Sequence, residues 1–174
     1  MAKLRKFIAY RRLDARPYTR RSKYRSKSFV RTKPHNRIVR YQMGNLQGGF
    51  PVMMELQATT ALQIRDNAIE SARQVVLRKL EKNFGKKGFL FEIRVYPHHV
   101  LRENPLASGA GADRMSTGMK MSFGKPIGVA ARIRKGQTLF RLSCQKDHVE
   151  QCKKFLSLAS TKLPCSCKLI IHNP

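Results

Sequence analysis

The sequence predicts an α+β fold, with two helices packed on a mostly antiparallel sheet. Short stretches in which apolar and polar residues alternate indicate strands, and two longer stretches with an apolar period of three to four indicate amphipathic helices. These patterns are grouped along the chain as strands, helix, strand, long loop, strand hairpin, helix and strand. A doubly wound α/β fold would alternate strands and helices throughout, so the grouping favours α+β.

The first strands and the first helix follow one another directly. Apolar and polar residues alternate over residues 38–43, which predicts a short strand. Residues 52–57 (VMMELQ) form a second short candidate strand, and the glycines between the two mark turns. From Thr59 onward the apolar residues recur every three or four positions, which predicts the first helix. Thr59 or Thr60 is the expected N-cap, and Gly85 is expected to end the helix.

Apolar and polar residues alternate more clearly in the second half of the chain. Lys135-Gly136 indicates a tight turn that joins two strands into a hairpin. Asp147 followed by Glu150 resembles a capping box and predicts the start of the second helix, which ends before Pro164. The strands of this half are predicted at residues 89–97, 127–133, 137–144 and 168–172.

The charge of the chain indicates a polyanionic partner. The 174 residues suit one domain with an attached arm, and 36 Lys and Arg against ten Asp and Glu give a net charge of +26. Such a chain repels itself unless a polyanion neutralises it, so nucleic acid or an anionic surface is expected. No apolar run approaches the roughly 18 residues of a membrane span. The basic N-terminus lacks the apolar segment of a secretory signal, although charge alone does not separate it from an Arg-rich transit peptide.

Residues 1–36 are predicted to form an extended basic arm, because neither a helix nor a strand period continues through them. Fifteen basic residues, ten of them arginine, precede residue 41, against one acid, Asp14. Arginine bonds phosphate bidentately and stacks on bases, and aromatic rings stack on unpaired bases. An RNA contact is therefore favoured over the alternative, a solvated tail. The aromatic residues between the charges are Phe7, Tyr10, Tyr18, Tyr24 and Phe29.

The glycine-rich residues 107–126 do not complete a nucleotide-binding motif. Gly109-Ala-Gly111 lacks the third glycine of a dinucleotide loop and does not open a helix directly after a strand. The FGKP tetrapeptide at 123–126 has proline where a P-loop needs the Ser or Thr that binds magnesium. Because strands are predicted on both sides of this stretch, a finger anchored in one domain is favoured over a linker.

No constellation of residues nominates an enzyme. His98 and His99 are adjacent, so in a strand they face opposite sides and do not both ligate one metal. For His98 a structural role and an RNA contact are the two interpretations, and for Asp113 beside Arg114 a local turn and a ligand contact. The four cysteines contain no CxxC pair and are interpreted as reduced, buried apolar residues. We expect no catalytic residue, no metal, no cofactor and no small-molecule substrate.

Residues 95–132 (VYPHHVLRENPLASGAGADRMSTGMKMSFGKPIGVAAR) carry a specific resemblance. With RPYTRR at 16–21 and the helix around 68–72, they resemble the large-subunit ribosomal protein family numbered ten, e-type, of archaea and eukaryotes, a relative of bacterial large-subunit protein sixteen. The similarity covers most of 10–142, and the last thirty residues match in pattern only. The chain looks more like an archaeal member, since it has no long C-terminal extension. SKYRSKSF, after Arg21, departs from the family's pattern.

The resemblance implies a hammerhead-type α+β domain embedded in large-subunit rRNA near the central protuberance, in the cytoplasmic ribosome. Residues 1–36 would be the rRNA-binding arm, and 37–174 a single domain carrying a loop, 102–122, that extends toward the peptidyl-transferase centre and tRNA. The implied role is a structural constituent that supports tRNA positioning and subunit assembly in translation, because the centre itself is RNA. Implied partners are large-subunit rRNA, tRNA, 5S rRNA and neighbouring ribosomal proteins, with no membrane. The alternatives are a free-standing RNA-binding assembly factor or RNA chaperone, and an RNA-modifying enzyme.

The candidate site residues fall into two groups. The residues expected to bind rRNA are Arg5, Arg11, Arg12, Arg16, Tyr18, Arg20, Arg21, Lys23, Arg25, Arg31, Arg94, His98, Arg132 and Arg134. The resemblance implies that the loop residues near tRNA and the peptidyl-transferase centre are Arg102, Ser108, Gly109, Gly111, Asp113, Arg114, Lys120 and Lys125.

Overall fold

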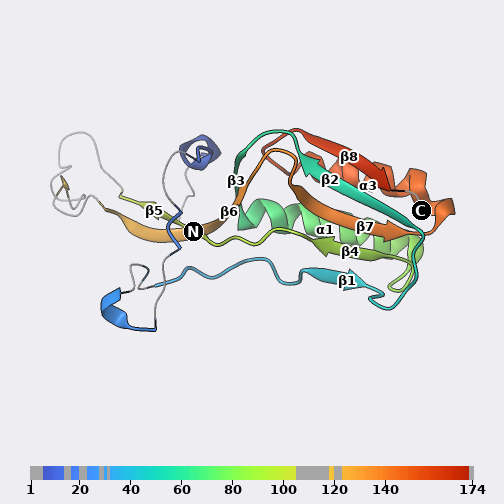
Figure 1. Ribbon diagram of the computed structural model, residues 1–174, viewed down its shortest axis with the longest axis horizontal. Helices are drawn as coiled ribbons and strands as arrows, with labels where there is room; N and C mark the ends of the chain where they lie inside the picture. The colour runs from blue at the N-terminus through green and yellow to red at the C-terminus, as the bar shows by residue number, and fades with distance from the viewer. Residues whose placement is uncertain are drawn as a thin grey trace.

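The structure, a computed structural model, describes residues 6–13, 17–19, 23–27, 30, 32–104, 118–119 and 123–172, and only the backbone of Phe7, Ala9 and Arg25. The predicted α+β class is confirmed: within these residues the chain forms two α-helices and two antiparallel sheets. A wide sheet and both helices occupy one end of the molecule, and a narrow sheet occupies the other (Figure 1).

The wide sheet has five strands in the order β1-β4-β7-β2-β8, and each neighbouring pair is antiparallel. The longer strands show the alternation that the sequence predicts: in β2, Val52, Met54 and Leu56 are buried, while Met53 and Gln57 are less so. The strands span β1 Gln42–Gly44, β2 Val52–Ala58, β4 Leu90–Ile93, β7 Thr138–Cys144 and β8 Cys167–His172.

The narrow sheet has the order β3-β6-β5 and contains two strands that the sequence analysis missed. They are β3 Leu62–Arg65 and β5 His99–Glu103, which pair on either side of β6 Lys125–Ile133. The predicted hairpin of 127–133 with 137–144 is therefore wrong. The tight turn exists, with φ of 77° at Gly136, but its N–H donates to the carbonyl of Ala58, 2.8 Å away, and β6 and β7 join different sheets.

Helix α1, Asp66–Phe84, begins later than predicted. The expected N-caps Thr59 and Thr60 are wrong, because the residues that follow them pair as β3. The Thr59 hydroxyl instead bonds to the carbonyl of Ser166, 2.8 Å away. The expected end is confirmed: Gly85 has a φ of 68°, which glycine tolerates, and its N–H donates to the carbonyl of Glu81, 3.1 Å away.

Helix α3, Val149–Ser160, starts close to the predicted position, but the contact that fixes its start is not the predicted one. A 3-10 turn, Lys146–His148, precedes it, and no side chain caps it, so the predicted capping box is absent. His148 stacks on Phe84 of α1 with ring centroids 4.1 Å apart. Packing between the helices thus fixes this start in place of a local cap.

The core lies between the helices and one face of the wide sheet (Figure 1). Leu80 of α1, Leu156 of α3 and Met54 of β2 are fully buried in it, and Phe91 and Phe140 pack with ring centroids 5.5 Å apart. On the opposite face of the sheet Glu55 of β2 accepts two bonds from the Arg141 guanidinium of β7, at 3.1 and 2.9 Å. One face of the sheet is therefore apolar, and on the other face polar side chains form hydrogen bonds and ion pairs with one another.

The segment before β1 is attached to α1 by side chains, not by strand pairing. The N–H of Arg37 donates to Asp66, 3.1 Å away, and the N–H of Val39 donates to Glu70, 3.4 Å away. Glu70 also pairs with Arg73, whose side chain is 8% exposed. These bonds replace a strand ladder, which explains why only the end of the predicted 38–43 strand is paired.

Candidate nucleic-acid interface

The narrow sheet carries the N-terminal arm. Gln63 of β3 is 6% exposed, and its N–H donates to the carbonyl of Arg11, 3.2 Å away. The Gln63 side-chain amide donates to the carbonyls of Tyr10 and Arg12, at 3.1 and 2.6 Å. A buried amide has to find partners inside the protein. Here the backbone of the arm supplies the acceptors for the amide N–H groups, so this part of the arm is bonded to the sheet.

The next part of the arm lies along β5 and β6. The N–H of Val100 donates to the carbonyl of Tyr18 at 3.0 Å, and the guanidinium of Arg132 donates to the carbonyl of Leu13 at 2.8 Å. Val30 is 5% exposed and packs with Val100 and Val129 in a small apolar cluster. The arm thus contacts all three strands of the narrow sheet.

His99 completes this docking, a role that the sequence analysis did not assign. Its Nδ1 accepts the N–H of Tyr18 at 2.8 Å, and the residue is 9% exposed. Burial, followed by the nearby cations of Arg132 and Arg102, lowers the pKa of His99 to about 4. The ring is therefore neutral at pH 7, and because Nδ1 is the acceptor, Nε2 carries the proton. The only signal in the sequence for this contact was a histidine directly before the apolar residues Val100 and Leu101.

Arg102 connects the arm to both ends of the loop. Its guanidinium lies 4.5 Å from the ring centroid of Tyr18 and 3.9 Å from that of Phe123, a cation–π arrangement with two rings. It also donates to the carbonyl of Phe123, 3.3 Å away. The two rings meet edge to face with centroids 5.5 Å apart. We call Tyr18, Arg102 and Phe123 the loop-base cluster.

Gly124 lets the two ends of the loop approach closely. Its φ is 79°, and a Cβ there would lie 2.8 Å from the carbonyl carbon of Glu103. The next pairs, Glu103 with Lys125 and Arg102 with Pro126, are in register in the β5–β6 ladder. The glycine of FGKP, which matched no complete P-loop, thus closes the base of the loop in the fold.

The predicted arm residues do not share one environment. Arg11, Arg12 and Lys23 are exposed, and Tyr18 is partly buried in the loop-base cluster. The backbone of Arg25 lies in a 3-10 turn, Arg25–Lys27. The predicted residues that lie outside the described part of the chain are Arg5, Arg16, Arg20, Arg21 and Arg31.

The predicted residues of the body also differ from one another. The Arg94 side chain is 47% exposed and 3.8 Å from Glu92, and Arg134 is exposed at the turn after β6. His98 is exposed and lies against Tyr96, with ring centroids 4.5 Å apart. Arg132 is partly buried, since it holds the arm. Because Arg94, His98 and Arg134 are exposed, a partner could reach their side chains.

In the predicted loop group, Arg102 is partly buried in the loop-base cluster and Lys125 is exposed at the start of β6. The other predicted loop residues, Ser108, Gly109, Gly111, Asp113, Arg114 and Lys120, lie outside the described part of the chain.

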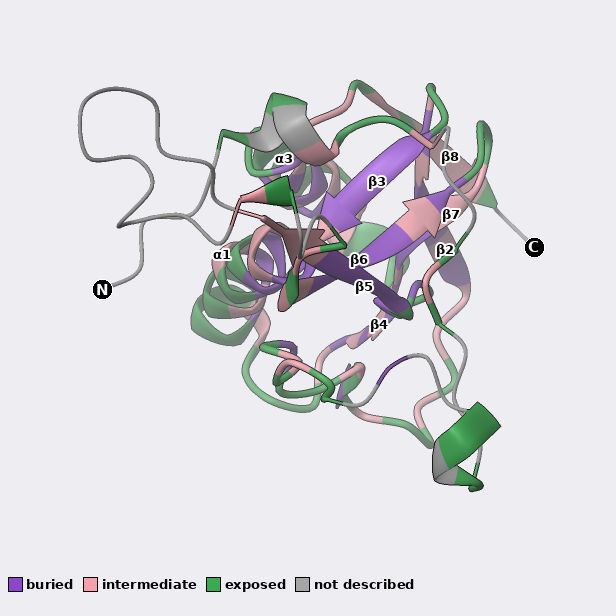
Figure 2. Ribbon diagram, turned by 90° about the vertical axis from the view of Figure 1, so that its left-hand side faces the viewer, coloured by how far each residue is buried: buried purple, intermediate pink, exposed green. Residues whose placement is uncertain are grey.

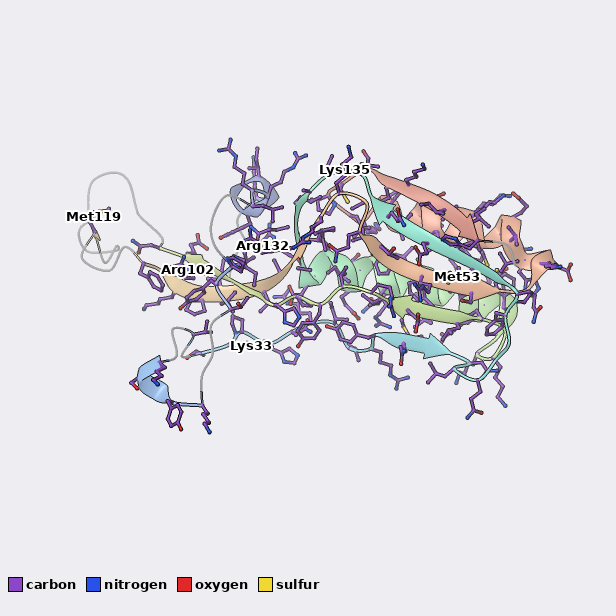
Figure 3. All side chains as sticks on the ribbon, in the orientation of Figure 1. Lys33, Met53, Arg102, Met119, Arg132 and Lys135 are labelled. Atoms are coloured by element: carbon purple, nitrogen blue, oxygen red, sulfur yellow. The ribbon has the colours of Figure 1, made fainter. Side chains whose placement is uncertain are left out.

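The arm and both ends of the loop lie at the same end of the molecule. Figure 2 views this end, with β3, β5 and β6 in front, buried over much of their length and less buried toward the loop, and exposed arm segments around them. Lys33, Arg102 and Arg132 are found here, whereas Met53 of the wide sheet is at the other end (Figure 3). A polyanion that contacted the arm would therefore also reach the base of the loop.

Two further findings concern other kinds of site. In the described residues, no three or more His, Cys, Asp or Glu side chains are grouped to hold a metal ion. Cys165 and Cys167 have their sulfur atoms 3.8 Å apart, and Cys144 and Cys152 are buried in the core. None of the described helices is both long and apolar enough to cross a membrane.

Comparisons with known proteins agree on one family. The family model described as Ribosomal protein L16p/L10e matches residues 14–170. The chain is 45% identical over 168 residues to the large ribosomal subunit protein uL16 of Methanococcus aeolicus, covering 97% of this chain and 94% of that protein. It is 43% identical over 163 residues to uL16 of Methanosphaerula palustris, covering 94% and 91%. It is 40% identical over 163 residues to uL16 of Archaeoglobus fulgidus, covering 94% and 90%.

Proposed function

The chain belongs to the L16p/L10e family of ribosomal proteins, and we propose that it binds large-subunit rRNA near the central protuberance through its arm and narrow sheet. As a member of this family it is a structural, non-enzymatic component of the large ribosomal subunit in the cytoplasm, and it associates with rRNA and other ribosomal proteins. Which residues contact RNA and where the loop points are proposed from the contacts of the arm and of the loop ends.

The docking of the arm on the narrow sheet is the observation that carries this proposal. Bonds from Gln63, Val100 and Arg132 fix the backbone of the arm at residues 10–13 and 18. The exposed Arg11 and Arg12 side chains therefore project from a fixed backbone. A basic segment that is already ordered loses less entropy when it binds a polyanion than a free tail does.

We assign two roles to the predicted rRNA-binding residues. Arg11, Arg12, Lys23, Arg94, His98 and Arg134 are exposed and contact rRNA, together with Arg5, Arg16, Arg20, Arg21, Arg25 and Arg31. Tyr18 and Arg132 instead hold the arm in place and affect RNA binding through it. Residues 1–36 then act as the binding arm and 37–174 as the domain that positions it.

The loop is proposed to reach toward the peptidyl-transferase centre and tRNA. Both of its ends leave the narrow sheet at one point, where Gly124 touches Glu103 and Arg102 stacks on Phe123. Because both ends of the loop are fixed in this way, they determine the direction in which the loop leaves the sheet. Contacts with tRNA and with 5S rRNA, and support of subunit assembly, belong to this proposal.

Deleting residues 107–116 tests the role of the loop. The deletion lies between the ends of β5 and β6, so the variant should fold, enter large subunits and resist a high-salt wash as the parent does. We expect slower tRNA accommodation or incomplete subunit maturation, measured by single-turnover tRNA binding and by sucrose-gradient profiles. Normal values in both assays would contradict the role of the loop, and loss of the protein in high salt would favour an assembly factor.

Replacing Arg11 and Arg12 by alanine tests the arm. Each lost phosphate contact should reduce the slope of log affinity against log salt by about 0.7 to 0.9. The matched control replaces Lys86 and Lys87, two exposed cations in the turn after α1, so the loss of charge is equal. An equal loss of rRNA affinity in both double variants would show that net charge, and not the docked arm, determines binding.

A further inference from the structure

A cavity of about 330 Å³ opens between the narrow sheet, the start of α1 and the segment 34–37. Small-molecule sites begin at about 300 Å³, so a cavity of this size suits a single small group. Its floor is apolar and is formed by Leu101 of β5 and Ile127 of β6. Leu101 is 4% exposed, so this floor is continuous with the packed interior of the sheet, whereas the neighbouring Val129 packs with Val30 and Val100.

The rim of this cavity is polar and mainly basic. His35, Arg37 and Arg65 contribute to it, and Asn67 adds a side-chain amide at the first turn of α1. The cavity therefore combines an apolar floor with cations and hydrogen-bonding groups at its mouth. A nucleotide needs this combination, because its base has an apolar face and its phosphate is an anion.

Asp66 adds an acceptor inside this basic rim. It is 6% exposed and lines the cavity. One of its carboxylate oxygens accepts the N–H of Arg37 at 3.1 Å, and the other accepts the N–H of Asn67 at 2.8 Å. A carboxylate has about four lone-pair positions, so these two bonds leave acceptor capacity for the amino or imino group of a base.

The strand beneath the cavity is shaped by a bulge and a glycine. Leu101 pairs with Gly128 and Arg102 with Pro126, so Ile127 is an extra residue in β6. A Cβ added at Gly128 would meet no atom within 4 Å, and Gly128 has no positive φ that requires a glycine. The backbone therefore leaves open space where any other residue would place a side chain. Bulges of this kind occur often beside binding sites.

The geometry points to a site for one unpaired rRNA nucleotide, whose base enters this cavity while its phosphate lies against the basic rim. This inference rests on the proposed rRNA binding and adds a site that none of the predicted contact residues forms. A free phosphate would use the rim but not the apolar floor, and an apolar protein side chain would leave the remaining acceptor capacity of Asp66 unused. The nucleotide uses all three features.

Gly128→Leu tests the inference by filling the cavity from its floor without removing a rim charge. Gly49→Leu is the matched control, because Gly49 is exposed, has no positive φ and also leaves open space at its Cβ. Large subunits that carry each variant are probed with dimethyl sulfate and kethoxal, which modify unpaired bases. We expect one nucleotide to become reactive in the Gly128→Leu subunits and to stay protected in Gly49→Leu and parental subunits.

A second measurement uses purified protein and a single-stranded RNA in which one nucleotide is abasic. Burial of an apolar surface the size of one small side chain corresponds to an affinity change of about 10- to 150-fold. We expect the intact RNA to bind more tightly than the abasic RNA to the parent, and the difference to vanish in Gly128→Leu. Gly128→Ala, a smaller obstruction, replaces it if Gly128→Leu fails to fold. Identical footprints in the Gly128 and Gly49 variants, with the protein retained in the subunits, would overturn the cavity site alone. Absence of the parental protein from rRNA would instead overturn the proposed function.

Discussion

Lowering the pH from 7.5 to 5 should weaken the fold by about 2 kcal/mol through one side chain, His99. In the folded protein burial, assisted by Arg132 and Arg102, lowers the pKa of His99 to about 4 from an ordinary value of 6.5. In the unfolded chain the imidazole therefore binds a proton as the pH falls through 6.5, while the folded protein binds it only near pH 4. Protonation thus favours the unfolded state across this window.

The size of this effect follows from the two pKa values alone. At pH 7.5 His99 is neutral in both states and contributes almost nothing. At pH 5 the unfolded chain is largely protonated and the folded chain is not, which gives the 2 kcal/mol above. Hydrogen bonds from Arg73 hold the pKa of Glu70 below its usual value of 4.5, so the stability that Glu70 contributes is lost mainly as the pH falls below that value, and it adds little to the loss at pH 5.

Urea unfolding of the purified chain at pH 7.5 and pH 5 measures the effect. His99→Asn should remove it, because the Asn side-chain oxygen can accept the Tyr18 N–H and does not titrate. His98→Asn is the control, since His98 is exposed and adjacent, and this variant should keep the full pH dependence of the parent. Equal pH dependence of the free energy of unfolding in all three proteins would refute the assignment of the buried, neutral acceptor to His99.

Three further substitutions test other contacts. Glu70→Gln should destabilise the fold by about 3 to 5 kcal/mol in thermal or urea unfolding, because it leaves the buried Arg73 without its counter-charge. Gly44→Ala should lower the melting temperature, since its φ is 95° and a Cβ would lie 2.1 Å from the carbonyl oxygen of Phe89, whereas Gly49→Ala should not. Arg102→Ala should increase proteolytic cleavage in the arm at unchanged global stability, because it removes the stack on Tyr18; unchanged cleavage would show that the loop-base cluster does not hold the arm.

Local patterns predicted most helices and strands of this fold. The apolar alternation of β2 and β7 and the helical period of α1 and α3 are set by neighbouring residues and a single buried face, so they are visible in the sequence. The glycine at position 85 was likewise predictable, because a positive φ at a helix end has a local cause.

The division into two sheets had no such signal. Leu62 and Ile64 fit both the helical period and a strand, and only pairing with Ala131 and Ile133 of β6 makes them β3. Strand pairing joins residues that are far apart in the chain, so a local pattern does not contain it. The same reason explains why β5 was missed, because it pairs with β6 on the other side of the loop.

The candidate site was predictable in composition but not in the roles of its residues. Arginine and aromatic content correctly indicated an RNA-associated family, yet Tyr18 and Arg132 bond to the protein itself. The contact of Tyr18 with His99 spans 81 residues of sequence. No spacing rule reaches that far, which is why His99 was treated only as the neighbour of His98.

The charge around position 99 favours a neutral acceptor, such as histidine, over a charged one. The acceptor of the Tyr18 N–H lies beside Arg102 and Arg132, whose cations lower its pKa. A carboxylate could accept the same bond, but it would pair with these arginines and draw them away from the Leu13 carbonyl and the Phe123 ring. A protonated imidazole would add a third cation and lose the acceptor. Neutral imidazole holds the arm without altering the positive charge on which the proposed rRNA binding depends, so docking of the arm and attraction of a polyanion would not compete.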